Sequence, residues 1–323
     1  MEYDNFLVYI NGDFVRRSEA QFGLNDVGFR AGYVIYDTER TFDGKVYQLD
    51  IHLNRFWKSM KYVRLNPHIT MDEMKEATLE LAKRNDAIRE PGDDYMISQI
   101  VTGGEGENRL SSDGKETPAG PTVIIWPDPM NWILYADAWN RGAHVVIPKT
   151  RSYSPHMLDS KLKHYSRFNM NMAVHEAHDV DPEAYALLTD MDGNISESTG
   201  SNFFIVTNGI LKTPTDKSSL AGVSRMNILN LAKQLGIPTS VEDIQPYDVY
   251  TADEAFLTST PHCLLPVGKA DNREITENIP GPVTKQLVAA WSEMIEFDIQ
   301  GQVEQQAKTL TSRSGLDSIR RME

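Results

Sequence analysis

Apolar and polar residues alternate along several short stretches of the chain, and four pairs of these stretches are joined by an Asn-Gly or Asp-Gly dipeptide. The dipeptides are Asn11-Gly12, Asp43-Gly44, Asp192-Gly193 and Asn208-Gly209. Such a dipeptide between alternating segments predicts a β-hairpin, because its residues readily adopt the positive φ that a tight turn needs. Two hairpins fall early in the chain and two fall late, so each half is expected to form its own largely antiparallel sheet.

Segments with the spacing of amphipathic helices lie between the predicted strands. In residues 51–63 an apolar stripe recurs at helical spacing, and Arg55 lies off it. A second helix is predicted from the capping box at residues 70–73 to about residue 84. Further helices are predicted over residues 163–177, 224–235 and 282–297.

These elements predict two α+β lobes. The first domain is expected to span residues 1–128, and a Pro-rich stretch places the interdomain connection at residues 129–141. The second domain is expected to span residues 142–299. A polar tail, residues 300–323, is interpreted as either a surface helix or a disordered segment.

Composition narrows the functional classes. The 323 residues include 32 Lys and Arg against 46 Asp and Glu, a net charge of −14, which argues against binding to nucleic acid or to an anionic membrane. The single cysteine, Cys263, leaves no intrachain disulfide and no cysteine-built metal site. His175 and His178 share a helical segment but lack an evident third ligand, so no metal is expected. Apolar runs are far shorter than the roughly 20 residues of a membrane span, and a soluble, cytoplasmic protein is expected.

The stretch from Glu197 to Arg225 is the most informative for chemistry. Glu197 precedes a turn of small residues and an apolar strand, and Gly222 precedes a helix whose first N–H groups belong to Val223 and Ser224. A helix start of this kind binds phosphate. Taken separately, the two features are better explained as a surface glutamate and an ordinary helix start. Their combination indicates a functional site.

Residues 197–225 resemble the signature of the class IV pyridoxal-phosphate aminotransferases. That signature is a Glu, a small residue two positions on, and an Asn five positions on that is followed by an apolar and an aromatic residue. It continues with apolar-x-Thr and apolar-x-Gly-apolar-x-basic, and this chain meets every position. The resemblance extends from about Val8 to Ile295. It implies a two-lobed class IV aminotransferase fold, with pyridoxal 5'-phosphate in the interdomain cleft, and a homodimer.

The resemblance also implies the residue that binds the cofactor covalently. In the family a lysine lies thirteen residues before a Glu-Ala pair, and counting back from Glu176-Ala177 leads to Lys163. Lys161 is the competing candidate. The lysine would also move a proton between the substrate carbon and the cofactor, which requires its neutral form.

Other family contacts map onto individual positions of this chain. Arg55 is expected to bind the cofactor phosphate with its paired donors, a role suited to guanidinium. Thr260 and the start of the predicted helix at Val223 and Ser224 would complete the phosphate site. Glu197 would face the pyridine nitrogen. Arg167 stands where several relatives have a tyrosine that bonds the cofactor's phenolic oxygen, and it is assigned to the same oxygen.

Substrate recognition is assigned by resemblance to the first lobe. If residues 36–42 form a strand, Tyr36, Thr38 and Arg40 share one face, but the sequence does not show which face meets the cofactor. Arg109 resembles a loop arginine that receives a substrate carboxylate. Ile97 stands where branched-chain enzymes carry an arginine, which argues against a branched-chain substrate.

The predicted activity is the transfer of an amino group from an amine or amino acid to a 2-oxo acid. The donor is left open among (R)-amines, D-amino acids and branched-chain amino acids. Two alternatives remain at this stage. One is an enzyme of the same fold that resembles aminodeoxychorismate lyase, and the other is a non-catalytic binding protein.

Overall fold

A computed structural model of the chain describes residues 3–105, 120–276 and 278–313. The chain divides into two compact units. Unit 1 comprises residues 1–130 together with residues 162–167, and unit 2 comprises residues 131–161 and 168–323. The short segment 162–167 therefore belongs to unit 1, although it is far from the rest of that unit in the sequence.

Unit 1 contains a six-stranded antiparallel sheet with the strand order β2-β1-β6-β5-β3-β4 among the described residues. The strands are β1 (Leu7–Ile10), β2 (Asp13–Arg16), β3 (Val34–Phe42), β4 (Lys45–Val46), β5 (Tyr95–Thr102) and β6 (Val123–Pro129). Three short helical segments accompany them, namely η1 (Tyr3–Asn5), η2 (Arg17–Glu19) and α1 (Val27–Ala31).

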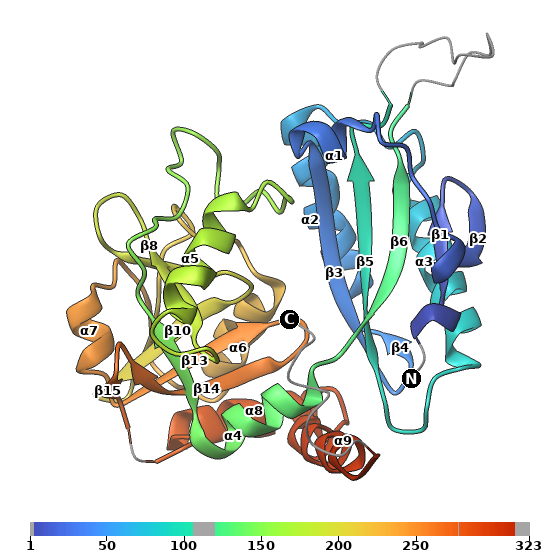
Figure 1. Ribbon diagram of the computed structural model, residues 1–323. Coiled ribbons are helices and arrows are strands. Elements are labelled where there is room, and N and C mark those ends of the chain that lie inside the picture. Colours follow the sequence, from blue (N-terminus) through green and yellow to red (C-terminus); the bar gives the residue numbers. More distant parts are fainter. Residues whose placement is uncertain (1–2, 106–119, 277, 314–323) are drawn as a thin grey trace, which may run out of the picture. The chain divides into compact units, whose positions relative to one another are not determined.

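Two longer helices, α2 (Leu49–Val63) and α3 (Met71–Asp86), lie along the unit 1 sheet (Figure 1). They bury Leu53, Phe56, Met74 and Leu81, each 0% exposed. Burial of such a side chain contributes roughly 1.5–3 kcal/mol to folding. The expected capping box starts α3, with reciprocal hydrogen bonds between Thr70 and its N3 residue.

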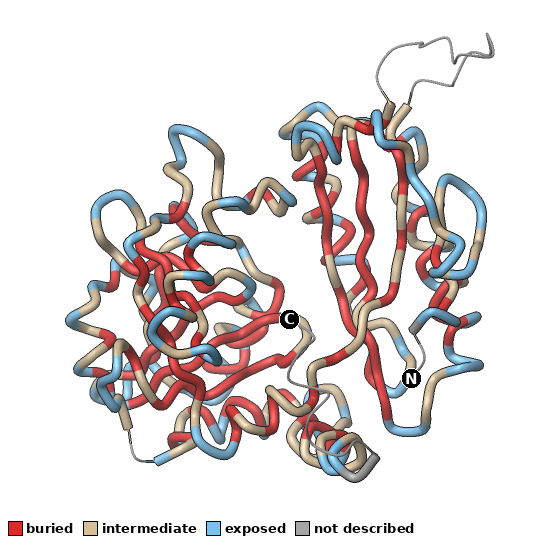
Figure 2. The backbone as a smooth tube through the Cα atoms, viewed as in Figure 1, coloured by how far each residue is buried: buried red, intermediate tan, exposed pale blue. Residues whose placement is uncertain are grey.

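Unit 2 contains a sheet with the order β12-β11-β10-β13-β14-β7-β8-β9, and β15 pairs with β14. The strands are β7 (Ala143–Val146), β8 (Tyr185–Thr189), β9 (Ile195–Ser198), β10 (Asn202–Thr207), β11 (Ile210–Thr213), β12 (Thr239–Val241), β13 (Glu254–Ser259), β14 (Cys263–Ala270) and β15 (Arg273–Glu274). Its helices are α4 (Trp132–Arg141), α5 (Phe168–His178), α6 (Val223–Gln234), α7 (Pro246–Tyr250), α8 (Pro282–Met294) and α9 (Ile299–Arg313). Most strand pairs are antiparallel, whereas β11–β12, β14–β7 and β7–β8 are parallel. Buried residues follow the central strands of this sheet (Figure 2).

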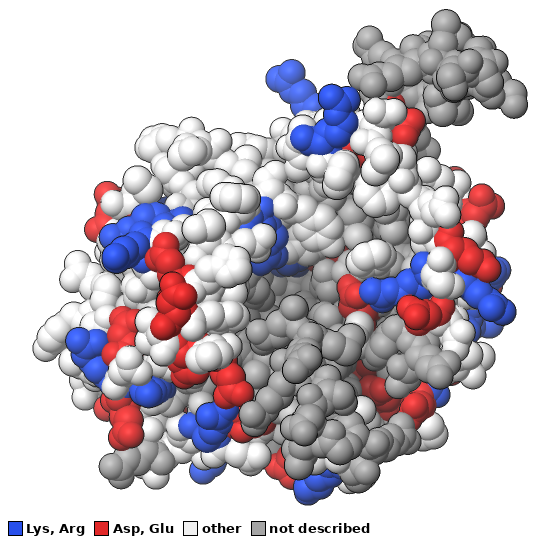
Figure 3. All heavy atoms as spheres, viewed as in Figure 1, with Lys and Arg blue, Asp and Glu red and all other residues white. Residues whose placement is uncertain are grey.

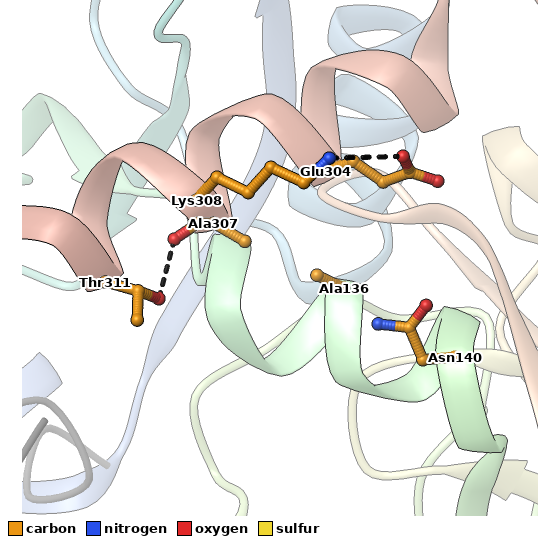
Figure 4. Close-up of a pocket in the computed structure, with 6 residues that line it drawn as sticks. All are labelled: Ala136, Asn140, Glu304, Ala307, Lys308 and Thr311. Carbon is orange, nitrogen blue, oxygen red and sulfur yellow. Dashed lines mark hydrogen bonds and ion pairs between the residues drawn. The ribbon is translucent and has the colours of Figure 1, made fainter.

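Helix α9 packs against α4 within unit 2. Its apolar residues Ile299 and Val303 are 0% and 1% exposed, so this part of the predicted tail is a packed helix. A pocket between the two helices is lined by Ala136, Asn140, Glu304, Ala307, Lys308 and Thr311 (Figure 4). The short side chains of Ala136 and Ala307 leave this space. Residues 314–323 of the tail lie outside the described residues.

All four predicted hairpins are confirmed. The Asn-Gly and Asp-Gly dipeptides join β1 to β2, β3 to β4, β8 to β9 and β10 to β11. Asn11, Asp43 and Asn208 have positive φ, as do all four glycines, which is the conformation these turns require. Residues 132–141, part of the predicted connection, form helix α4.

The helix predicted over residues 163–177 is wrong at its start. Helix α5 begins at Phe168, and residues 163–165 are extended alongside β3. The Tyr36 N–H donates to the Lys163 carbonyl at 3.1 Å, and the Tyr165 N–H donates to the Val34 carbonyl at 3.2 Å. These hydrogen bonds with a distant strand replace the local bonds that a helix would form.

No helix in the described ranges is both long and apolar enough to cross a membrane. On the face drawn in Figure 3, Lys and Arg side chains are interspersed with Asp and Glu side chains. Within the residues the structure describes, no group of three or more His, Cys, Asp or Glu side chains could hold a metal ion.

Candidate active site

The position of Lys163 follows from the short ladder between residues 163–165 and β3. Ile35 and His164 form an antiparallel bridge, which places Lys163 opposite Tyr36 and Tyr165 opposite Val34. Residues opposite one another in an antiparallel pair share a face of the sheet. The ladder therefore places the Lys163 amine on the same face as Tyr36, and its Nζ lies 4.5 Å from the centre of the Tyr36 ring.

The Tyr36 hydroxyl accepts hydrogen bonds from two cationic side chains, Lys163 and Arg167. Burial alone would raise the pKa of Tyr36, but the two nearby positive charges outweigh it and lower the pKa below its ordinary value. The Tyr165 ring packs against the Tyr36 ring, with ring centroids 4.2 Å apart. His164 lies next to the lysine, and burial together with Arg167 and Lys163 lowers its pKa to about 4.

The two lysines considered from the sequence have different surroundings. Lys161 has a side chain that is 48% exposed, and its Nζ pairs with Asp159 at 3.0 Å. Lys163 is partly buried and contacts Tyr36. The surroundings of Lys163 therefore suit an anchor for a cofactor better than those of Lys161.

Arg55 is engaged within unit 1 by a buried carboxylate. Its Nε and Nη2 donate to the two oxygens of Asp37 at 2.8 and 2.6 Å, and His52 contacts the same carboxylate at 2.8 Å. Although burial opposes ionisation of Asp37, Arg55 and His52 hold its pKa well below the usual range. The predicted contact between Arg55 and a cofactor phosphate stays a prediction.

Strand β3 presents Tyr36, Thr38 and Arg40 on one face, as the alternation predicted. Asp37 lies on the other face, where it meets α2 through Arg55. The face of Tyr36 is therefore the one opposite α2, and it is the face on which the Lys163 amine lies. Thr38 bonds to Ser98 at 2.9 Å.

Arg40 is almost fully buried, at 1% exposed. Its Nε donates to the Thr41 carbonyl at 3.0 Å, and its guanidinium lies 4.0 Å from the centre of the Phe42 ring. A contact between Arg40 and a substrate carboxylate stays a prediction. The other candidate for that contact, Arg109, lies outside the described residues.

The argument drawn from Ile97 needs correction. Ile97 pairs with Glu39 across β3 and β5, so it shares the helix-covered face and is 0% exposed. Its neighbour Ser98 pairs with Thr38 and lies on the Lys163 face. The identity of residue 97 therefore does not bear on the substrate, and it no longer argues against a branched-chain one.

In unit 2, Glu197 lies in β9 and is 9% exposed. Its Oε2 accepts hydrogen bonds from Asn202 Nδ2 at 3.3 Å and from the Leu220 N–H at 3.0 Å. Asn202 also donates to the Leu220 carbonyl at 2.9 Å. This arrangement fixes the direction of the Glu197 carboxylate and connects it to the loop that leads into α6.

Helix α6 begins at Val223 without a side-chain cap, because Gly222 occupies the N-cap position. A Cβ at Gly222 would lie 2.0 Å from Asn202 Oδ1, so only glycine allows this close approach. Val223 and Ser224 are each 6% exposed. Thr260 follows directly after β13, whose residue Thr258 pairs with Asn202 across the sheet.

Each unit, taken by itself, supplies groups that suit one part of pyridoxal 5'-phosphate. An aldehyde requires an amine, which Lys163 provides. A phosphate suits the start of α6, since no side chain caps its N–H groups. A pyridine nitrogen suits the oriented carboxylate of Glu197.

Two features of the site were missed in the sequence. The first is that Asp37 and His52 surround Arg55. The sequence did hold a signal for His52, because it precedes Arg55 by three residues and so shares its helix face. The second is the role of Asn202 in holding Glu197. The spacing of five residues across a hairpin-like turn was a signal for that contact.

Comparisons with known proteins identify the family of the chain. The family model described as amino-transferase class IV matches residues 34–270. A relative from Methanocaldococcus jannaschii, provisionally named a branched-chain-amino-acid aminotransferase, is 32% identical over 87% of this chain and 93% of its own length. The branched-chain-amino-acid aminotransferase of Escherichia coli K12 is 27% identical over 88% of this chain and 91% of its own.

The fold also matches a solved structure. The branched-chain aminotransferase of the thermophilic archaeon Thermoproteus uzoniensis, with norvaline, superimposes with a TM-score of 0.77 at 24% identity, and the match covers 93% of this chain and 96% of that one. The likeness confirms the predicted fold. The relatives named above carry aminotransferase names, so the lyase and the non-catalytic alternative are not favoured. The chain belongs to the class IV aminotransferases, and its activity is transamination with pyridoxal 5'-phosphate.

Proposed function

We propose that this chain transfers the amino group of a branched-chain amino acid to a 2-oxo acid, with Lys163 as the covalent anchor of the cofactor. The observation that carries the proposal is the apolar surface next to the lysine. Tyr36 and Ile100 form a buried cluster, against which Ile124 and Trp126 pack. These residues lie on the same sheet face as the Lys163 amine, and an apolar side chain of a substrate would fit such a surface. The names of the relatives favour the same substrate class.

Each residue of the site has a distinct task in this proposal. When bound, the cofactor stabilises the negative charge that develops at the substrate carbon. Lys163 holds the cofactor and moves the proton at that carbon, and Glu197 keeps a positive charge on the ring nitrogen. Val223, Ser224, Thr260 and Arg55 bind the phosphate, and Arg167 bonds the phenolic oxygen. Tyr36, Thr38, Arg40 and Arg109 contact the substrate.

A substrate panel tests the donor. The purified enzyme would be given L-leucine, D-alanine or (R)-1-phenylethylamine with 2-oxoglutarate, and the amino acid product would be measured. We expect L-leucine to be the fastest donor by at least about tenfold. A higher rate with either of the other two donors would reject the branched-chain assignment.

Borohydride reduction tests the anchor. Reduction of the yellow enzyme followed by peptide mapping is expected to find the cofactor on Lys163. Lys163→Ala should abolish turnover, whereas the matched variant Lys161→Ala should retain it, since Lys161 is exposed and paired with Asp159. A label on Lys161 would reverse the assignment.

We also propose that the enzyme is a cytoplasmic homodimer. Three large apolar side chains in one short segment of unit 1 support an interface, because Phe22, Leu24 and Phe29 are 51%, 78% and 66% exposed. Sedimentation of the wild type and of Leu24→Ser would test it. A monomeric wild type would reject the dimer. The cytoplasmic location rests on the acidic composition and the single cysteine.

A further inference from the structure

The phenol of Tyr36 is placed between two cations by main-chain register. The ladder of residues 163–165 with β3 sets Lys163 opposite Tyr36, and Arg167 reaches the hydroxyl from the same segment. Tyr36 is 7% exposed. Its oxygen is thus a buried acceptor that contacts the amine required for proton transfer.

The surroundings of Tyr36 favour its ionised form over that of an ordinary tyrosine. Lys163 and Arg167 outweigh the effect of burial and lower the pKa of Tyr36. Two other titratable groups nearby, His164 and Tyr165, are less suited to accept a proton from Lys163. His164 pairs with Ile35 and lies on the opposite face. Burial raises the pKa of Tyr165, and the charges of Tyr36 and Asp128 add to this effect.

We propose that Tyr36 is the proton partner of Lys163. The phenolate oxygen takes a proton from the Lys163 ammonium, so that one N–H bond breaks, one O–H bond forms, and an ion pair becomes a neutral amine and a neutral phenol. The reverse transfer restores the pair. Lys163 thereby becomes neutral, as its proton-moving task requires, without releasing a proton to solvent. The inference goes beyond substrate contact and rests on the proposed role of Lys163.

Fluorine-19 NMR measures the ionisation of this one phenol in the holoenzyme with the cofactor in its pyridoxamine form, in which Lys163 has a free amine. Incorporation of 3-fluorotyrosine at position 36 alone gives a chemical shift that follows the phenol through a pH titration. The matched control carries the same residue at position 165, whose ring lies against Tyr36. We expect position 36 to titrate at least about one pH unit below position 165. A midpoint at position 36 equal to or above that at position 165 would overturn the inference.

Kinetics of the amine half-reaction provide the second readout. Tyr36→Phe keeps the ring but removes the oxygen, and it is expected to lower kcat about a hundredfold, a typical effect for loss of a proton-transfer group. KM for the donor should change less than about twofold, and Tyr165→Phe should leave kcat within about twofold. A raised KM with unchanged kcat would show that Tyr36 only binds substrate, and would overturn the proton role.

The fluorotyrosine enzyme also distinguishes proton transfer by Tyr36 from a purely structural role of this residue. Because fluorine acidifies the phenol, 3-fluorotyrosine at position 36 should move the acidic limb of the kcat–pH profile to lower pH, while the same residue at position 165 should leave it in place. An unmoved limb would contradict the inference. Borohydride labelling separates the two proposals, since loss of the label at Lys163 would refute the anchor and not the titration of Tyr36.

Discussion

Replacement of Glu39 by Gln tests a buried carboxyl group on the helix-covered face of β3. Glu39 is 0% exposed. Its Oε1 accepts a hydrogen bond from Gln99 Nε2, which also donates to Thr78 Oγ1 at 3.2 Å. The second oxygen, Glu39 Oε2, and the amide oxygen of Gln99 are buried and have no hydrogen-bond partner. Burial, with a contribution from the negative charge of Asp37, raises the pKa of Glu39 well above its ordinary value.

The sign of the pH dependence follows from proton linkage. The folded chain keeps a proton on Glu39 over a pH range in which the unfolded chain has lost it. The stabilisation that this bound proton gives to the folded chain is fully present below the unfolded pKa of about 4.3. The stabilisation is lost as the pH rises through the folded pKa. Between these two values the free energy of unfolding falls by about 1.4 kcal/mol per pH unit. Glutamine at position 39 removes this loss.

The variant should gain a second benefit where Glu39 would be ionised. The amide of Gln at position 39 can donate to the unpartnered oxygen of Gln99 at every pH, whereas Glu39 can donate only while it is protonated, and an unsatisfied buried acceptor costs roughly 1–3 kcal/mol. We therefore expect Glu39→Gln to be more stable than the wild type. The difference should grow by about 1.4 kcal/mol per pH unit above the unfolded pKa and then level off.

Urea unfolding, followed by tryptophan fluorescence at a series of pH values above about 4.5, measures this difference. Asp37→Asn is the matched control, because it is two residues away on the same face and its folded pKa is lowered by Arg55 and His52. The control should be less stable than the wild type by about 3–5 kcal/mol at neutral pH, and this loss should stay nearly constant over the measured pH range, because Asp37 is ionised in both the folded and the unfolded chain above the unfolded pKa of about 3.9. A stability difference for Glu39→Gln that is constant or declines with rising pH would refute the reasoning.

Two substitutions test the unit 2 part of the site. Glu197→Gln should lower turnover far more than cofactor affinity, because Asn202 still holds the side chain while the charge that faces the ring nitrogen is lost. Steady-state rates and cofactor titration would measure the two effects. Unchanged turnover would reject this role of Glu197. Gly222→Ala should lower stability by roughly 1–3 kcal/mol and weaken cofactor retention in dialysis, since its Cβ would lie 2.0 Å from Asn202 Oδ1. An alanine variant with wild-type stability and retention would contradict the close approach.

The turns and most helices could be predicted because their causes are local. Asn-Gly and Asp-Gly pairs readily adopt the positive φ of tight turns, and the four predicted hairpins form as expected. The capping box at Thr70 and the Pro at the start of α8 likewise act within one helical turn. The signature at residues 197–225 was also local, and its Glu197 and Asn202 are joined by a hydrogen bond.

The conformation of residues 163–167 could not be predicted in the same way. Their main-chain partners are Val34 and Tyr36, more than a hundred residues away in the sequence. Apolar spacing in this segment was compatible with a helix, and tertiary hydrogen bonds decided otherwise. The same limit applies to Arg55, because its carboxylate partner Asp37 comes from another element.

Strand register set a second limit. The family resemblance placed Ile97 where branched-chain enzymes carry an arginine, but the pairing of Thr38 with Ser98 places the neighbouring residue on the Lys163 face. Side chains alternate with a period of two, so an error of one residue exchanges the faces completely. Correct identification of the strand was therefore not enough to identify its functional residues.

The alternation of side chains between the two faces of the sheet also determines which residues surround the Lys163 amine. If residues 163–165 were shifted by one position against β3, His164 would occupy the face of Tyr36, and the lysine amine would turn towards the helix-covered side. Ser166 opposes such a shift, because its hydroxyl donates to the Gly32 carbonyl at 2.7 Å. Gly32 has a φ of +66°, and a Cβ there would lie 2.7 Å from Ser166 Oγ. The contact between Ser166 and Gly32 therefore supports the strand register that places Lys163 opposite Tyr36.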